Sequence, residues 1–235
     1  ATAHWLQGIG LDPSEVLICN PLPMHHVSGL MPWWRSRCWG VPHLILEPGW
    51  LKQPQLLLAF CQAQSGWGQR PALLSVVPTQ LGRLLADPSG IDWLQRFSVV
   101  WVGGAALPAV MADQARQAGI RLAPCYGATE TAAMVAALPP ERFLQGDASC
   151  GTPLMDVALR LAADGALEVK TSRLAIACWR PEQPQQLQGL SDASGWWRSG
   201  DRAVLEGDLH ILGRLDGAVL SGGETVFPDQ LEARL

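Results

Sequence analysis

The sequence predicts an α/β fold, a parallel sheet flanked by helices, followed by a small antiparallel β-barrel-like region. Three observations predict it. The 235 residues are 48% hydrophobic and 16% charged, which supplies enough apolar side chains for a sizeable core. Short apolar runs alternate with helical segments up to about residue 145. Beyond that point the apolar runs stay short, and turn-forming residues recur between them.

In the first part, runs of apolar residues predict strands that are buried on both faces. Five such runs lie at 15–19, 41–46, 73–77, 97–102 and 121–125. Apolar spacing, together with prolines at first-turn positions, predicts helices at 54–64, 78–85 and 108–118. Ligands of such sheets bind outside the carboxyl ends of the strands. We therefore expect a site in the loops after 102 and after 125.

In the second part, short antiparallel strands are predicted at 157–161, 166–170, 174–179, 203–206 and 209–212. The Gln- and Pro-containing stretch 181–188 predicts an exposed loop. Pro228 suits a first helical position, so a helix is predicted to begin there and to run through 228–235.

Composition and charge limit the partners and the cell compartment that we expect. The net charge is −4 and no block of Lys or Arg occurs, so nucleic acid is not an expected partner. The uncharged stretch 97–112 is shorter than the ~20 residues that a membrane-spanning helix needs, and it contains Gly103, Gly104 and Pro108. The six cysteines include no C-x-x-C pair, which removes zinc spacing and favours a reducing cytoplasm. The first residues lack a signal-peptide pattern.

The motif richest in chemistry is Y-G-A-T-E-T at 126–131, directly after a predicted strand. An aromatic ring can stack on a base, and glycine permits a close backbone approach. A threonine hydroxyl can bind a phosphate oxygen, and a glutamate can hold Mg²⁺ beside phosphates. The alternative is a plain helix start with Thr129 as its N-cap.

Four further stretches accompany this motif in order. They are PLPMHHVSGL at 21–30, VGGAALP at 102–108, GWWRSGD at 195–201, and GRLD at 213–216, which is followed by SGGE at 221–224 and Pro228. Together the five stretches resemble the adenylate-forming, AMP-binding superfamily of acyl-CoA synthetases, luciferases and peptide-synthetase adenylation domains. The resemblance extends over essentially the whole chain.

The resemblance implies roles in nucleotide binding. Tyr126 would stack on adenine, Thr129 would contact the AMP phosphate, and Glu130 would hold Mg²⁺. Asp201 would accept hydrogen bonds from the ribose hydroxyls, and Arg214 would lie near the ribose or phosphate.

The resemblance also implies an acyl site. His26 would lie beside the acyl pocket as a catalytic residue, although a partly buried structural histidine is the plain alternative. His25 and His26 could also be read as a pair of metal ligands, but the sequence places no third ligand near them. Gly103, Gly104 and Gly127 would supply backbone close to the acyl group and the nucleotide.

Asp216 matches the hinge about which a small C-terminal domain turns. Gly222 and Gly223 match a loop lining the tunnel for CoA, although a plain loop turn would also explain them. We thus expect an α/β subdomain at 1–145, a β-rich barrel-like subdomain at 146–213, and the hinge with the start of a C-terminal domain at 214–235.

Similarity within the family is greatest to the o-succinylbenzoate–CoA ligases of menaquinone and phylloquinone synthesis. It implies an acid–thiol ligase that uses ATP, Mg²⁺ and CoA to activate a small carboxylic acid. Arg35, Arg37 and His26 are candidates for binding the dianionic acid. Other acyl- or aryl-CoA synthetases remain alternatives, as does a degenerate, non-catalytic module that binds a nucleotide or a partner. A homodimer is left open.

Two family elements are missing from this sequence. It contains no Gly- and Ser/Thr-rich phosphate loop before residue 21, and neither Lys52 nor Lys170 matches the lysine of the C-terminal domain. The chain resembles a fragment, and we expect it by itself to adenylate weakly or not at all.

Overall fold

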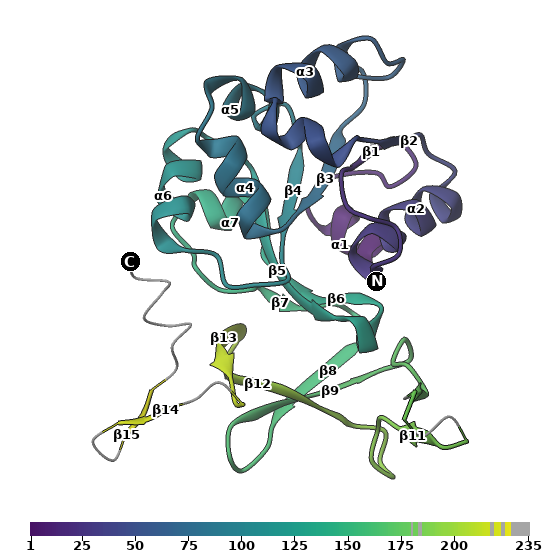
Figure 1. Cartoon of the computed structure of the whole chain (residues 1–235), viewed down its shortest axis with the longest axis vertical. Coiled ribbons are helices and arrows are strands. Elements are labelled where there is room, and N and C mark those ends of the chain that lie inside the picture. The colour runs from purple at the N-terminus through teal and green to yellow at the C-terminus, as the bar shows by residue number, and fades with distance from the viewer. Residues whose placement is uncertain (180, 183–184, 217–218, 222–223, 227–235) are drawn as a thin grey trace.

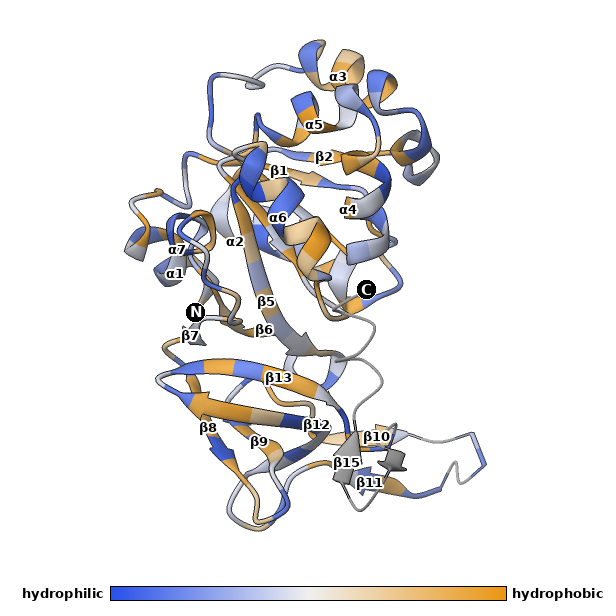
Figure 2. Ribbon diagram, turned by 90° about the vertical axis from the view of Figure 1, so that its left-hand side faces the viewer, coloured by the Kyte–Doolittle hydropathy of each residue, from blue (hydrophilic) through white to orange (hydrophobic). Residues whose placement is uncertain are grey.

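The computed structural model describes residues 1–179, 181–182, 185–216, 219–221 and 224–226. An α/β part lies above a β-rich part in Figure 1, and the side view in Figure 2 shows the same two parts with hydrophobic residues along their strands. The predicted helix over 228–235 lies outside the described residues, as do Gly222 and Gly223.

A mixed seven-stranded sheet forms the centre of the α/β part, in the order β2-β1-β3-β4-β5-β6-β7. Neighbours from β2 to β5 are parallel, whereas β5, β6 and β7 pair antiparallel. The five parallel strands confirm the prediction, and the antiparallel extension was not predicted. The strands are β1 (Leu17–Asn20), β2 (His43–Ile45), β3 (Ala72–Val76), β4 (Val99–Val102), β5 (Leu122–Ala128), β6 (Ala133–Ala137) and β7 (Thr152–Pro153).

Helices cover both faces of this sheet, as predicted (Figure 1). On one face lie α3 (Pro54–Gln62), α4 (Pro78–Leu85), α5 (Pro88–Leu94), α6 (Ala109–Gln117) and α7 (Pro140–Leu144). On the other face lie α1 (Thr2–Gly8) and α2 (Val27–Trp39). Two short 3₁₀ helices, η1 (Pro48–Lys52) and η2 (Thr129–Thr131), complete this part. The helices α1, α2, α5 and α7 were not predicted.

Successive residues of the central strands supply the two cores alternately, because side chains of a strand point to opposite faces. Leu74 and Val76 of β3 pack into the core under α3 to α7, while Leu73 packs into the core under α1 and α2. A strand buried on both faces must be apolar at every position, which is why these runs were recognisable in the sequence.

A four-stranded antiparallel sheet, in the order β13-β12-β9-β8, forms the β-rich part and confirms the predicted fold class. Its strands are β8 (Val157–Leu161), β9 (Ala166–Thr171), β12 (Trp197–Glu206) and β13 (Asp208–Arg214). Two small hairpins accompany it, one of β10 (Ala177–Trp179) with β11 (Leu187–Gly189), the other of β14 (Val219–Ser221) with β15 (Glu224–Val226).

The two parts share a third core. Val135 and Ala136 of β6 pack against Leu167, Val169 and Leu209 of the second sheet. The strand β6 therefore holds the two sheets together. Among the residues that the structure describes, none of the helices combines the length and the apolar character that crossing a bilayer requires.

Candidate active site

The Y-G-A-T-E-T stretch lies where β5 meets η2. The site loop predicted after residue 125 begins later than expected, because Tyr126 and Gly127 continue β5 and pair with β6 across a bulge. The alternative with Thr129 as N-cap is wrong, since Ala128 holds the N-cap position of η2. Thr129 is exposed at the start of η2 and Glu130 is half-buried beside it.

Gly127 has no room for a side chain. A Cβ built there would lie 2.1 Å from the carbonyl oxygen of Ala133 on the paired strand β6. This close approach of two backbones requires glycine. Pairing of β5 with β6 is therefore enough to require glycine at this position, whether or not a ligand also approaches its backbone.

Tyr126 and Asp201 join the two sheets. The phenol oxygen of Tyr126 donates a hydrogen bond to the Asp201 carboxylate on β12, with 2.5 Å between the oxygens. Burial raises the pKa of the Tyr126 hydroxyl well above its usual range, and the hydrogen bond to the Asp201 carboxylate adds to this effect. The hydroxyl therefore stays protonated and remains a donor at neutral pH.

Arg214 extends this cluster at the end of β13. Its Nη1 lies 3.6 Å from Asp201 Oδ1, and its Nε and Nη2 donate to the two oxygens of Asp216 at 3.0 Å each. The guanidinium lies over Gly200, where an added Cβ would be 2.8 Å from Nη2. The structure thus brings together four of the predicted residues: Tyr126, Asp201, Arg214 and Asp216.

Gly103 and Gly104 follow β4 at the carboxyl end of the parallel strands. Gly104 has a φ of 85°, a region that favours glycine. A Cβ on Gly103 would lie 3.0 Å from the backbone oxygen of Cys125 on the neighbouring strand β5. The glycine turn and the start of the Y-G-A-T-E-T stretch are therefore side by side.

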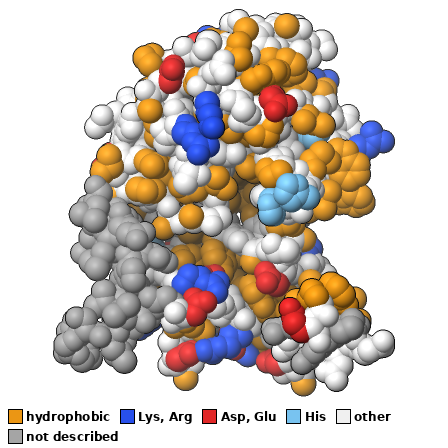
Figure 3. Space-filling model, in the orientation of Figure 1, with side chains coloured by type: hydrophobic (Ala, Val, Ile, Leu, Met, Phe, Trp, Pro, Cys, Tyr) orange, Lys and Arg blue, Asp and Glu red, His pale blue; other side chains and the backbone are white. Residues whose placement is uncertain are grey.

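His26 stands at the N-cap of α2 and is exposed, so the alternative of a partly buried structural histidine is wrong. Its ring centroid lies 4.3 Å from that of His25. Within the described residues no group of three His, Cys, Asp or Glu side chains could hold a metal ion. Figure 3 shows the surface drawn in at the waist between the α/β part and the β-rich part.

Arg35 and Arg37 lie on α2, and the sequence could not rank them, or His26, as ligands of the acid. Arg35 is 7% exposed, and its guanidinium lies over the Trp101 ring, 5.4 Å from the centroid. Its Nε is buried without a hydrogen-bond partner in the part of the chain that the structure describes. Burial lowers the pKa of Arg35 to about 10, so the side chain is still charged at neutral pH. Arg37 is exposed.

Sequence reasoning missed Arg173. Its guanidinium donates to the backbone oxygen of Thr131 at 2.8 Å, directly behind the Y-G-A-T-E-T stretch. No motif marks this arginine, because the atoms that it holds in this stretch are main-chain oxygens, which any sequence supplies.

Fold and site together define a class. A parallel sheet with helices on both faces and an antiparallel sheet below it place a glycine turn, a T-E-T turn and a Tyr–Asp–Arg cluster near the carboxyl ends of the strands. This is the arrangement of an adenylate-forming enzyme's large domain. A family model described as AMP-binding enzyme matches residues 1–172. The chain belongs to the AMP-binding enzyme family.

Individual proteins of known name to which the chain is similar are consistent with this family. The chain is 34% identical to the 2-succinylbenzoate–CoA ligase of Escherichia coli, over 90% of this chain and 42% of that protein. It is 28% identical to the ligase of the same name from a Geobacillus species, over 99% of this chain and 48% of that protein. A solved structure of a variant of E. coli MenE with bound OSB-AMS is similar at 30% identity and a TM-score of 0.73, over 98% of this chain and 47% of that one. This chain spans about half the length of these relatives.

Proposed function

We propose that this chain supplies the acyl- and nucleotide-binding part of an o-succinylbenzoate–CoA ligase. In that reaction the substrate carboxylate attacks the α-phosphate of ATP, which gives an acyl-adenylate and pyrophosphate. The thiol of CoA then attacks the acyl carbon and releases AMP. The names of the relatives support the reaction class.

The Tyr–Asp–Arg cluster supports the nucleotide side of the proposal. Asp201 offers carboxylate oxygens for ribose hydroxyls, and Tyr126 offers its ring for stacking on adenine. Arg214, 3.6 Å from Asp201, would add a positive charge near the phosphate. Such a site acts mainly by positioning the reactants and by stabilising developing charge.

Glu130 supports Mg²⁺ binding. Its side chain is half-buried, and in the described part of the chain it forms no ion pair within 4.0 Å. Since no group of three ligating side chains exists among the described residues, the ion would take its other ligands from phosphate oxygens and water. Mg²⁺ commonly binds in this way beside nucleotide phosphates. It would neutralise phosphate charge there.

The observation that carries the substrate assignment is Arg35. A buried, charged side chain whose Nε has no hydrogen-bond partner among the described residues is costly, and an anion that binds beside it would reduce the cost. O-succinylbenzoate has a second carboxylate in addition to the one that reacts, and this second group would pair with Arg35. A fatty acid or a simple aryl acid has no such group. Arg37 is exposed and His26 stands at the other end of α2, so both rank below Arg35.

Isothermal titration with two adenylate analogues tests this proposal. One is the o-succinylbenzoyl-adenylate analogue OSB-AMS, and the other is a benzoyl-adenylate analogue without the second carboxylate. The wild-type chain is expected to prefer the first. Arg35→Met should remove that preference, by about tenfold to a hundredfold, because a charge-assisted hydrogen bond contributes roughly 1.5–3 kcal/mol. Arg37→Met, on the same helix, is the matched control and should keep it.

The outcomes separate the parts of the proposal. Equal affinity of the wild-type chain for both analogues would contradict the substrate. Loss of the preference in Arg37→Met but not in Arg35→Met would contradict the assignment to Arg35. Absence of binding for both analogues and for AMP would contradict the nucleotide site.

A further inference from the structure

The backbone directly after the T-E-T turn is strained. Ala132 and Ala133 have φ values of 52° and 77°, in the left-handed region that residues with a Cβ rarely adopt. Among the described residues they are the non-glycine residues with positive φ. Two such residues in succession persist only where surrounding contacts hold them.

One guanidinium holds the backbone on both sides of these alanines. Arg173 donates from Nη1 to the Thr131 oxygen at 2.8 Å and from Nη2 to the Met134 oxygen at 3.2 Å. The fully buried Thr131 side chain adds two bonds within the turn: its Oγ1 accepts from the Ala128 N–H at 3.1 Å and donates to the Ala133 oxygen at 2.8 Å.

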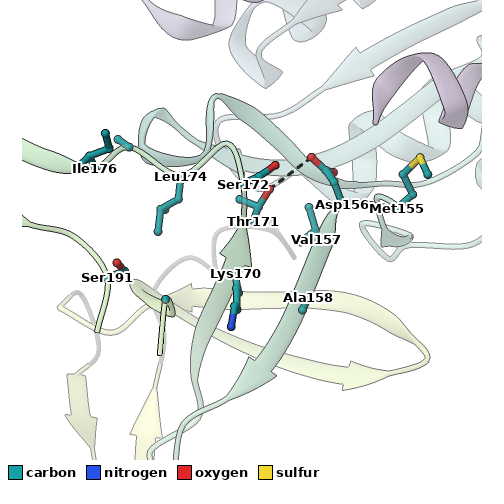
Figure 4. A pocket seen from close by; sticks show the side chains of 12 residues that line it. Met155, Asp156, Val157, Ala158, Lys170, Thr171, Ser172, Leu174, Ile176 and Ser191 are labelled. Atoms are coloured by element: carbon teal, nitrogen blue, oxygen red, sulfur yellow. Dashed lines mark hydrogen bonds between the residues drawn. The ribbon is translucent and has the colours of Figure 1, made fainter. Parts of the chain in front are cut away.

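Asp156 fixes the guanidinium in turn. Arg173 donates from Nε to Asp156 Oδ2 at 2.6 Å and from Nη2 to Oδ1 at 3.2 Å, so the two planar groups are paired through two bonds. Thr171 Oγ1 donates to the same carboxylate at 3.4 Å (Figure 4). This pairing lowers the pKa of the Asp156 carboxyl. Both side chains are about three-quarters buried, with 25% exposure each.

The segment after β9 forms one further hydrogen bond with the turn. The Ala175 N–H donates a hydrogen bond to the backbone carbonyl oxygen of Glu130 at 2.7 Å. Thr129 and Glu130 are thus presented by a turn whose backbone is bound at residues 130, 131 and 134 from one neighbouring segment, 173–175.

We propose that Arg173, oriented by Asp156, is a positioning residue for the Thr129–Glu130 turn. It acts on nucleotide binding through the backbone geometry of that turn and touches neither substrate nor metal. This inference rests on the proposed nucleotide site. A merely structural ion pair would support stability alone, and Arg160 of β8 provides such a pair for comparison. Arg160 donates to Glu168 at 2.5 Å and stacks on Trp196, away from the turn.

The experiment compares Arg173→Met, Asp156→Asn and the control Arg160→Met in the whole chain. Affinity for ATP is measured by titration calorimetry with and without Mg²⁺, well below the melting temperature of every variant. Native-state hydrogen exchange is followed at the amides of 129–134 and 175. Arg173→Met should weaken Mg²⁺-dependent ATP binding by about tenfold to a hundredfold, as expected for displaced binding groups. Asp156→Asn should weaken it less, because it keeps one acceptor for the guanidinium.

The same two variants should exchange faster at these amides, while Arg160→Met should match the wild type in affinity and exchange. Unchanged Mg²⁺-dependent affinity in Arg173→Met, beside a wild type that binds, overturns the proposal. If the wild type binds no ATP, the proposed nucleotide site fails, and exchange decides the inference. Faster exchange confined to the turn then supports the positioning role of Arg173, and unchanged exchange overturns it.

Discussion

At the scale of single residues, the candidate site depends on polar side chains that fix one another. The Tyr126 hydroxyl donates a hydrogen bond to the Asp201 carboxylate, and Asp201 also faces Arg214, which is paired with Asp216. Each partner keeps the next in one orientation, so a nucleotide would meet groups already in place. This pre-organisation lowers the entropy that binding must overcome.

Tyr126→Phe tests the strength of the link between Tyr126 and Asp201. The change leaves one carboxylate oxygen without its donor in a part-buried setting, so the free energy of unfolding should fall by roughly 1.5–3 kcal/mol. Asp201→Asn keeps a carbonyl acceptor for the hydroxyl and should cost less. Urea denaturation followed by tryptophan fluorescence measures both. An equal or larger loss in Asp201→Asn would contradict this account.

The Asp156–Arg173 pair predicts a dependence of stability on pH. Because the folded-state pKa of Asp156 lies below its unfolded value, the pair contributes stability that is fully present above the unfolded pKa of about 3.9. This contribution is lost as pH falls through the folded pKa. Unfolding measured from pH 7 down to pH 3 should therefore show a smaller decline in Asp156→Asn than in the wild type. Parallel curves would contradict the prediction.

At the scale of elements, the feature that shapes the site is the junction of β5 with β6. The strand β5 pairs parallel with β4 at its start and antiparallel with β6 at its end, where a bulge lies between Tyr126 and Gly127. The T-E-T turn projects from this junction because β5 and β6 are joined through it. Gly127 lets the two strands approach there.

Gly127→Ala is expected to destabilise the junction. The added Cβ would meet the Ala133 backbone at 2.1 Å, and overpacking of this kind costs about 1–3 kcal/mol. Gly8→Ala is the matched control, since a Cβ at Gly8 meets nothing within 4 Å and Gly8 ends a helix. It should leave stability unchanged or slightly raised. Thermal unfolding of both variants provides the measurement, and equal melting temperatures would contradict the prediction.

Several helices escaped prediction for local reasons. The helix α2 contains Pro32, and its first turn packs so closely on the preceding segment that a Cβ on Gly29 would lie 2.3 Å from the Pro23 oxygen. Proline and glycine normally mark helix ends. Packing against β1 and β6 keeps α2 helical in spite of them.

At the scale of the whole molecule, the core around β6 and several polar contacts hold the two sheets together, among them those of Arg142. Arg142 of α7 pairs with Asp147 near its own helix and with Asp208 at the start of β13. The backbones of Cys150 and Leu209 add a hydrogen bond of 2.8 Å between the same two regions. These contacts fix how Asp201 on the second sheet faces Tyr126 on the first.

Arg142→Met should loosen this connection. The pairs are partly exposed, so the loss of global stability is expected to be about 1 kcal/mol. Hydrogen exchange at 208–210 should rise more than exchange in the central strands. Arg198→Met, which breaks an exposed pair with Asp164 inside the second part, is the control and should leave 208–210 unchanged. Equal exchange at 208–210 in Arg142→Met and wild type would sink this prediction.

The sequence by itself determined the fold class, the family and the candidate residues. Strands buried on both faces are continuous apolar runs, so the sequence shows them directly. The five motifs resemble those of the family and occur in the family's order, so they indicate both the family and the candidate residues. The roles of Tyr126, Thr129, Glu130 and Asp201 stay predictions that the proposed measurements address.

Only the tertiary structure decided which candidates meet. It ranked the buried Arg35 over the exposed Arg37, paired Tyr126 with Asp201 across 75 positions, and placed Arg173 behind the T-E-T turn. Burial and contacts between distant segments arise from packing of whole sheets, which no local pattern records. Arg173 shows this most plainly, because it binds backbone oxygens that are the same in every sequence.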